Sequence, residues 1–185
     1  RYVWFHAASL GEFEQGRPIM ESLKNSHPEF KILLTFFSPS GYEVRKDYQG
    51  ADIICYLPMD MSWNVKRFLD IVQPDCAIFI KYEFWMNYLL ELKKRQIKTY
   101  IVSAIFRESQ LFFRSYGGFY RRLLKSFSHL FVQNDESVRL LHSIGVDNVT
   151  KVGDTRFDRV ADIAAKSKDL PIVQAFKSDA KVLIA

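Results

Sequence analysis

A carboxylate follows the first apolar run of the chain, at a place where an acid can act on a substrate. Glu12 closes the stretch Ser9-Leu-Gly-Glu12, directly after the apolar run Tyr2–Ala8. An acid held there can take a proton from a sugar hydroxyl as that oxygen attacks, which makes Glu12 a candidate general base. Gly11 beside it would allow an unusual backbone angle or the close approach of a ligand. The alternative interpretation of Glu12 is an acid that stabilises the positive end of a helix dipole.

Two later stretches carry polar residues in similar places. Ser38-Pro-Ser-Gly41 enters a predicted helix, and its hydroxyls and glycine suit a phosphate or carboxylate held by backbone N–H groups. Ser40 as an ordinary helix N-cap is the alternative. Glu83 follows the apolar run Cys76–Lys81, and Trp85 is either a platform for a sugar ring or a core residue. The predicted acceptor-binding residues are Ser9, Gly11, Ser38, Ser40, Gly41, Glu83 and Trp85.

Basic and aromatic residues alternate between Leu111 and Phe127, a stretch without acids. This pattern fits an anionic membrane surface or a lipid head group, and a basic groove with stacking rings also fits single-stranded nucleic acid. A partly buried helix with a solvated basic edge is the alternative. The residues predicted to form a lipid-facing surface are Phe112, Phe113, Arg114, Phe119, Arg121, Arg122 and Lys125.

Composition excludes several other classes of protein. The chain has 185 residues, of which 48% are hydrophobic and 25% charged, so disorder and fibrous repeats are excluded. Its net charge of +5 favours an anionic partner. Cys55 and Cys76 lie in apolar runs without a CxxC pattern and are expected to be reduced core thiols, and the four scattered histidines predict no metal site. Neither GxGxxG nor GxxxxGK[ST] occurs, and no apolar run is long enough to span a bilayer.

Short apolar runs alternate with helical patterns along most of the chain, which predicts a Rossmann-like α/β domain with a doubly wound parallel sheet. The expected strands are Tyr2–Ala8, Lys31–Phe37, Asp52–Leu57, Cys76–Lys81, Thr99–Ser103, His129–Gln133 and Val149–Gly153. The expected helices are Phe13–Asn25, Ser40–Tyr48, Trp63–Val72, Phe84–Arg95, Tyr116–Phe127, Glu136–Ile144 and Phe157–Ser167. In such sheets ligands bind outside the carboxyl ends of the strands, where Glu12 and Glu83 are expected. Asp135 is the expected N-cap of the sixth helix and Gly145 its C-terminal glycine.

The two ends of the sequence predict further protein on either side. The chain begins without Met inside an apolar segment, so we expect an upstream segment. Residues 1–165 are predicted to form the acceptor-binding domain. Residues 166–185 are predicted to be a linker followed by the first strand, Lys181–Ala185, of a second domain.

Taken in order, these segments resemble the N-terminal domain of the bacterial Kdo transferases, the 3-deoxy-D-manno-octulosonic acid transferases of lipopolysaccharide synthesis. The resemblance extends from the first strand to about Val160. The motifs that carry it are Ser9-Leu-Gly-Glu12, Ser38-Pro-Ser-Gly41, Glu83-Phe-Trp85 with Asn87, Gln133-Asn134 and Gly153-Asp-Thr-Arg-Phe-Asp158.

The resemblance implies the N-terminal half of a GT-B glycosyltransferase, in which two Rossmann-like domains face each other across a cleft. Such an enzyme transfers Kdo from CMP-Kdo to a lipid A precursor with inversion, at the cytoplasmic face of the inner membrane, anchored or peripheral. Glu12 would be the general base and Glu83 would line the same cleft. The resemblance implies no cofactor, no metal and no nucleic-acid partner, and places the CMP-Kdo site mainly in a C-terminal domain.

The sequence departs from the family pattern at two loops. Tyr82 and Met86 stand where many members have Thr before the acid and Pro after the tryptophan. Ser103-Ala-Ile105 lacks the arginine of the family's Asn-Ala-Arg segment, and Arg107 is the candidate replacement in acceptor binding.

Two other functions are also consistent with the sequence. One is another GT-B sugar-nucleotide enzyme, of the lipid A disaccharide synthase or epimerase type. The other is a non-catalytic Rossmann-like module that binds a membrane or RNA through the basic stretch.

Overall fold

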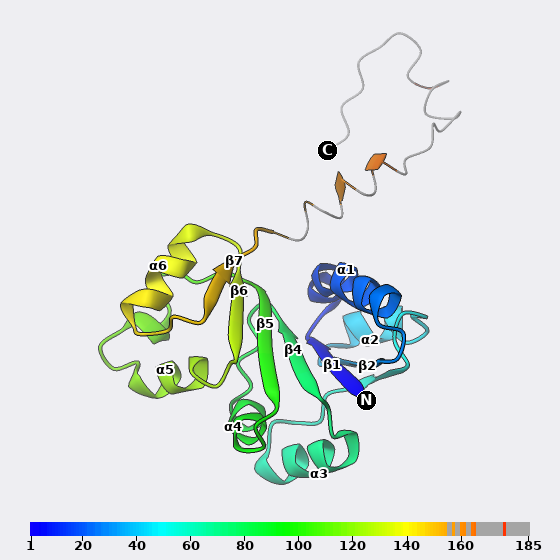
Figure 1. The fold of residues 1–185 in the computed structure, drawn as a ribbon, viewed down its shortest axis with the longest axis horizontal. Coiled ribbons are helices and arrows are strands. Elements are labelled where there is room, and N and C mark those ends of the chain that lie inside the picture. The colour runs from blue at the N-terminus through cyan, green and yellow to red at the C-terminus, as the bar shows by residue number, and fades with distance from the viewer. Residues whose placement is uncertain (155–156, 158–159, 162–163, 166–175, 177–185) are drawn as a thin grey trace. The chain divides into compact units, whose positions relative to one another are not determined.

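All the strands expected between residues 1 and 154 are present and join one parallel sheet. The computed structural model describes residues 1–154, 157, 160–161, 164–165 and 176. Within them the sheet has seven strands in the order β3-β2-β1-β4-β5-β6-β7 (Figure 1). The strands are β1 (Tyr2–Ala7), β2 (Lys31–Phe36), β3 (Ile53–Tyr56), β4 (Cys76–Ile80), β5 (Lys98–Ala104), β6 (His129–Val132) and β7 (Val149–Lys151). The change of direction between β1 and β4 makes the sheet doubly wound, as predicted.

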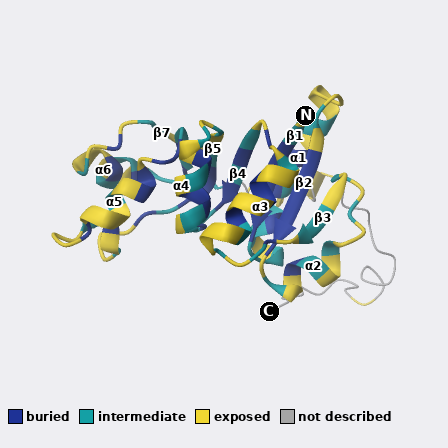
Figure 2. Ribbon diagram, turned by 90° about the horizontal axis from the view of Figure 1, so that it is seen from below, coloured by how far each residue is buried: buried dark blue, intermediate teal, exposed yellow. Residues whose placement is uncertain are grey.

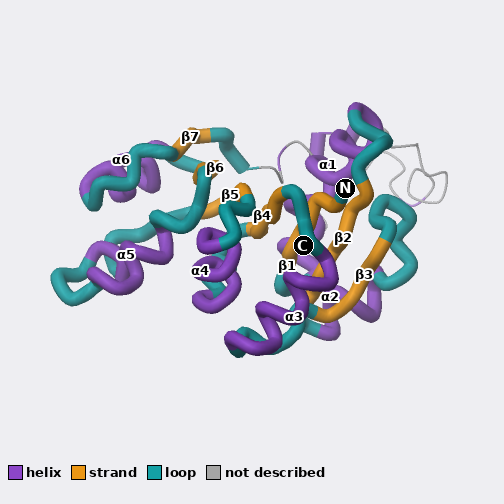
Figure 3. The backbone as a smooth tube through the Cα atoms, turned by 60° about the horizontal axis from the view of Figure 1, so that its bottom comes forward, coloured by secondary structure: helices purple, strands orange, loops and turns teal. Residues whose placement is uncertain are grey.

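Helices cover both faces of this sheet, so its central strands are buried on both sides (Figures 2 and 3). The helices are α1 (Leu10–Ser26), α2 (Pro39–Arg45), α3 (Ser62–Val72), α4 (Met86–Lys94), α5 (Gly118–Leu124) and α6 (Asp135–Ser143), with a 3-10 turn η1 (Leu111–Phe113). Successive side chains of a strand point to opposite faces, and β1 therefore contributes Val3 and Phe5 to one apolar cluster with Phe13 of α1. Trp4 points to the other face and joins the cluster formed with α3 and α4.

Helix ends differ from the sequence prediction where a side chain caps the backbone. The first helix begins at Leu10, earlier than predicted, because Ser9 caps it. The N-cap of α6 is Asn134, not Asp135: the Asn134 side chain accepts a hydrogen bond from the Ser137 N–H at 2.8 Å. Gly145 follows that helix at φ +71°, the left-handed conformation expected of a C-terminal glycine.

The sheet belongs to a compact unit, Arg1–Thr155, and residues 156–185 form a second unit. The predicted helix Phe157–Ser167 lies partly outside the described residues. The predicted strand Lys181–Ala185 lies outside the described residues, and so does the predicted linker before it, apart from residue 176. The domain boundary after residue 165 therefore stays a prediction.

Candidate active site at the carboxyl edge of the sheet

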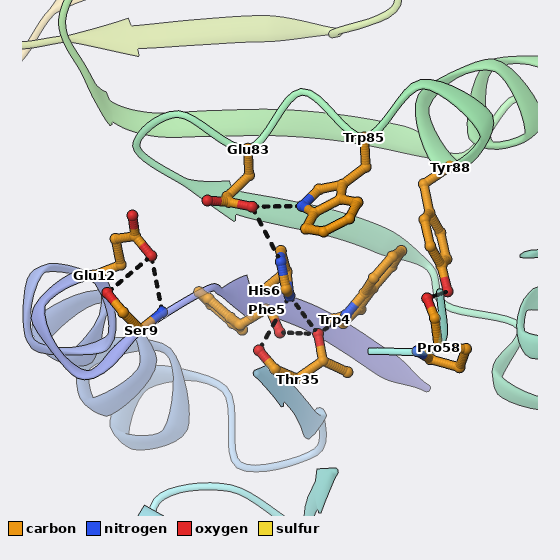
Figure 4. Close-up of polar contacts among 10 residues, drawn as sticks. All are labelled: Trp4, Phe5, His6, Ser9, Glu12, Thr35, Pro58, Glu83, Trp85 and Tyr88. Carbon is orange, nitrogen blue, oxygen red and sulfur yellow. Dashed lines mark hydrogen bonds and ion pairs between the residues drawn. The ribbon is translucent and has the colours of Figure 1, made fainter. Parts of the chain in front are cut away.

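The loops after β1, β2 and β4 meet at one edge of the sheet, because these strands are neighbours and run in parallel. The Ser38 N–H donates to the Ala8 carbonyl at 2.7 Å, which ties the loop after β2 to the loop after β1. The Phe37 and Trp85 rings lie 4.9 Å apart between centroids, which joins the loops after β2 and β4. Glu12 and Glu83 lie together at this edge, close enough for the charge of Glu83 to act on Glu12 (Figure 4).

The Glu12 carboxylate takes part in the cap of α1. Its Oε2 atom accepts hydrogen bonds from the Ser9 N–H at 2.9 Å and the Ser9 hydroxyl at 3.2 Å, completing a capping box at the start of α1. Among the described residues none donates a hydrogen bond to its other oxygen, Oε1. The cap thus fixes the orientation of the carboxylate and leaves one oxygen for a substrate.

The pKa of Glu12 is raised above the ordinary carboxyl value. Burial is the largest cause, followed by the negative charge of Glu83; the bonds from Ser9 and the charge of Lys81 oppose the shift. Lys81 lies just after β4 in the left-handed conformation, with φ +73°, which is strained for a side-chain-bearing residue. A carboxylate whose pKa is raised toward the operating pH is suited to take a proton from a hydroxyl.

Glu83 lies close to two ring nitrogens, and one of them donates a hydrogen bond to it. Its side chain is 10% exposed, and its Oε2 atom accepts a short hydrogen bond from the Trp85 indole N–H. The same oxygen lies 3.3 Å from Nε2 of His6, whose side chain is fully buried in β1. Trp85 is half-buried at the N-cap of α4, and in this structure its indole N–H orients Glu83 (Figure 4).

His6 and Thr35 are site residues that the sequence did not single out. Nδ1 of His6 lies 2.9 Å from Oγ1 of Thr35, which also accepts the Trp4 indole N–H at 2.8 Å. All three side chains are fully buried beneath Glu83 (Figure 4). The available signal was the place of His6 inside an otherwise apolar strand, where a polar ring needs partners.

Three predicted acceptor-binding residues have a different local role from the one expected. Gly11 has no positive φ, so the prediction of an unusual backbone angle is wrong, although the space beside it is open. Ser38, not Ser40, is the N-cap of α2: its Oγ accepts from the Ser40 N–H at 3.3 Å. Gly41 is buried, and a Cβ there would lie 2.3 Å from the Phe36 ring, so this glycine allows close packing. Ser40 is exposed at the edge.

The loop after β3 also reaches this edge, through Asp60, which was not among the predicted site residues. Asp60 accepts hydrogen bonds from two backbone N–H groups at the start of α4, those of Asn87 at 3.2 Å and Tyr88 at 3.1 Å. The Asn87 side chain returns a bond to the Asp60 carbonyl at 2.7 Å. These bonds anchor the helix that follows Trp85 and so fix the loop that carries Glu83.

The predicted lipid-facing surface does not form one patch beside this site. Phe112 is buried against Phe84, so its assignment to a surface is wrong. Lys125 lies near the amino ends of β5 and β6, beside Lys98 and Ser128, at the edge of the sheet opposite Glu12. The segment turns back along the sheet after η1, which separates its two ends.

The remaining predicted surface residues vary in exposure. Phe113 is half-buried, and Arg121 donates to the Arg114 carbonyl at 3.3 Å. Phe119, Arg114 and Arg122 are exposed.

Arg107 is exposed in the loop after β5, where its backbone N–H donates to the Gln110 side chain at 3.0 Å. No group of three or more metal-ligating side chains occurs among the described residues. Nor does any helix in the described part of the chain have the length and apolar character needed to cross a membrane. Cys55 and Cys76 are free and half-buried, and burial raises the pKa of both thiols.

The strand order and the helices on both faces define a Rossmann-like α/β domain. Solved structures with this fold include the UDP-GlcNAc 2-epimerase of Neisseria meningitidis bound to UDP-GlcNAc, with a TM-score of 0.65 at 17% identity over 97% of this chain and 54% of that one. The corresponding epimerase of Methanocaldococcus jannaschii gives a TM-score of 0.63 at 17% identity over 98% of this chain and 54% of that one. At this identity the likeness shows the fold alone.

Sequence comparison identifies the family. Residues 1–159 match the family model for 3-deoxy-D-manno-octulosonic-acid transferase, and the chain belongs to this family. The transferase of Aquifex aeolicus is 31% identical over 156 residues, 84% of this chain and 40% of the relative. That of Haemophilus influenzae is 34% identical over 103 residues, 55% of this chain and 24% of the relative. The predicted family and fold class are confirmed, and the chain spans less than half the length of these relatives.

Proposed function

We propose that this chain is the acceptor-binding half of an enzyme that transfers Kdo from CMP-Kdo to a lipid A precursor with inversion, with Glu12 as general base. The observation that carries the proposal is the state of Glu12: its carboxylate is fixed by Ser9 through one oxygen, and burial, followed by the charge of Glu83, raises its pKa. The family relatives are named 3-deoxy-D-manno-octulosonic acid transferases, which supports Kdo as the transferred sugar.

The proposed reaction is a direct displacement at the anomeric carbon of Kdo. Oε1 of Glu12 takes the proton of an acceptor hydroxyl while the hydroxyl oxygen forms a bond to the anomeric carbon of Kdo. The bond between that carbon and the phosphate oxygen of CMP breaks, and its electron pair leaves with CMP. Attack opposite the leaving group inverts the anomeric carbon. The donor is held mainly by a C-terminal domain, and no cofactor or metal takes part.

The Glu12→Gln variant of the whole enzyme tests the base assignment. We expect transfer to fall by about 10²–10⁴-fold while lipid acceptor still binds, since the amide keeps the shape but cannot take the proton. Glu21→Gln, in the same helix but paired with Arg17 on its exposed side, is the matched control and should keep full activity. Near-normal turnover by Glu12→Gln would refute the assignment of the base.

The acceptor is an acylated and phosphorylated disaccharide, so a basic surface near the site would hold its phosphates at the cytoplasmic face of the inner membrane. We assign this role to the exposed Arg107 and Arg114, which follow β5, and not to Lys125, which lies at the opposite edge of the sheet. We expect Arg114→Glu to weaken binding to anionic vesicles and Lys125→Glu to leave it unchanged, measured by co-sedimentation at low salt. Equal losses would show that the surface follows α5 instead; no binding by the unchanged protein would refute a lipid surface.

A further inference from the structure

His6 is a fully buried titratable side chain whose outer ring nitrogen faces the candidate site. Nε2 lies 3.3 Å from Oε2 of Glu83 but makes no hydrogen bond with the described residues in this arrangement. A buried ring nitrogen without a partner costs free energy, and Glu83 is the polar group beside it (Figure 4).

The contact of Nδ1 with Thr35, on the opposite side of the His6 ring, restricts which ring nitrogen carries the proton. Oγ1 of Thr35 accepts the Trp4 N–H, so its single proton goes either to Nδ1 of His6 at 2.9 Å or to the Phe5 carbonyl at 3.3 Å. In the first case the neutral ring carries its proton on Nε2. In the second case Nδ1 donates to Thr35, and Nε2 is protonated if the ring is charged.

A third arrangement is disfavoured by electrostatics. A neutral ring protonated on Nδ1 would point the Nε2 lone pair at the Glu83 oxygen. That oxygen already accepts the Trp85 N–H, so it faces the ring as an acceptor. Two lone pairs facing each other in a buried place repel, whereas an N–H facing a carboxylate attracts.

We propose that His6 is a positioning residue for Glu83: it keeps a proton on Nε2 and donates it to Oε2, beside the Trp85 indole. A small rotation of the carboxylate aligns the 3.3 Å contact into a hydrogen bond. When the Nε2–H of His6 and the indole N–H of Trp85 both bond to Oε2 of Glu83, the other oxygen of Glu83 is directed toward Glu12 (Figure 4). The other charged groups of this site are Glu12 and Lys81.

This arrangement supports Glu12 through the charge of Glu83. That charge is the second cause of the raised pKa of Glu12, after burial, so it acts only while Glu83 stays ionised and in place. The part of this proposal that concerns Kdo transfer rests on the proposed function. The part that concerns the proton on Nε2 of His6 does not.

Nitrogen NMR of the protein with labelled histidine tests the proton directly. The His6 signals are identified as those that persist when His27, His129 and His142 are replaced in turn. We expect Nε2 of His6 to be protonated at neutral pH and its signal to move in Glu83→Gln but not in the control Glu108→Gln, at an exposed site. An unprotonated Nε2, or a signal indifferent to Glu83→Gln, would overturn the proposal. Both glutamate variants leave the ring in place, so loss of folding in His6→Gln does not obscure this result.

Transfer by the whole enzyme then tests the consequence. The glutamine amide of His6→Gln extends as far as Nε2 does and can donate an N–H to Glu83. The shorter asparagine amide of His6→Asn extends only as far as Nδ1, so it can bond to Thr35 but cannot reach Glu83. We expect kcat to fall at least tenfold more in the asparagine variant than in the glutamine variant, with KM changed little. Equal losses in two folded variants would refute positioning through Nε2. Absence of Kdo transfer in the unchanged enzyme would refute the proposed function and leave the NMR result standing.

Discussion

Replacement of Thr35 by valine removes the hydroxyl that joins two buried rings. The variant leaves the Trp4 indole N–H, now bonded to Oγ1 at 2.8 Å, without an acceptor in a fully buried place. An unsatisfied buried donor costs about 1–3 kcal/mol. The bond between Oγ1 and Nδ1 of His6 is worth about 1 kcal/mol more. We therefore expect Thr35→Val to lower the free energy of unfolding by about 2–4 kcal/mol.

Thr35→Ser is the matched control, because it keeps the hydroxyl and loses one buried methyl group, worth about 1 kcal/mol. Urea unfolding followed by far-ultraviolet circular dichroism measures both variants against the unchanged protein. Valine should cost at least 1 kcal/mol more than serine, since the two differ mainly in the hydrogen bonds. A serine variant as unstable as the valine variant would mean that packing of the methyl group, and not the hydroxyl, holds this part of the core.

Three further outcomes follow from the same site. Glu83→Gln removes the negative charge that raises the pKa of Glu12, so the acid limb of the transfer rate should move to lower pH; an unchanged pH profile would contradict this. The folded chain holds the Glu12 proton to higher pH than the unfolded chain, so stability falls as pH rises from the ordinary carboxyl value through the folded pKa. Glu12→Gln should accordingly be more stable than the unchanged protein at neutral pH, with the difference shrinking at acid pH in thermal melts. Gly41→Ala places a Cβ 2.3 Å from the Phe36 ring and should lower stability by about 1–3 kcal/mol, or the melting temperature by about 2–4 °C per kcal/mol. Gly11→Ala, with nothing within 4 Å, is the control and should not lower it.

The fold was predictable because its strongest signals are local. Runs such as Lys31–Phe36 are apolar on both faces, which only a sheet covered on both sides can bury. Helix boundaries were less predictable, since they depend on which side chain captures a free N–H. Asn134 captures the N–H of Ser137 although Asp135 is also a common N-cap residue.

The candidate site was predictable only in its outer layer. Glu12 and Glu83 follow strands, and parallel topology brings the ends of neighbouring strands together. The layer beneath depends on register: His6 lies opposite Thr35 because β1 and β2 pair residue for residue from Tyr2 and Lys31. No spacing along the chain encodes that pairing, so a single histidine in an apolar run gives no indication of its partner.

Two acids at one edge of a sheet destabilise each other, and the fold around them limits this cost without removing it. Glu83 receives the Trp85 N–H on Oε2, and Glu12 receives the Ser9 N–H on its own Oε2. Neither bond removes the charge of Glu83 from the neighbourhood of Glu12. That charge therefore adds to burial, the larger cause, in raising the pKa of Glu12. A neutral pair would avoid this cost but could not accept a proton, so under the proposed function the repulsion that weakens the fold also suits Glu12 to act as the base.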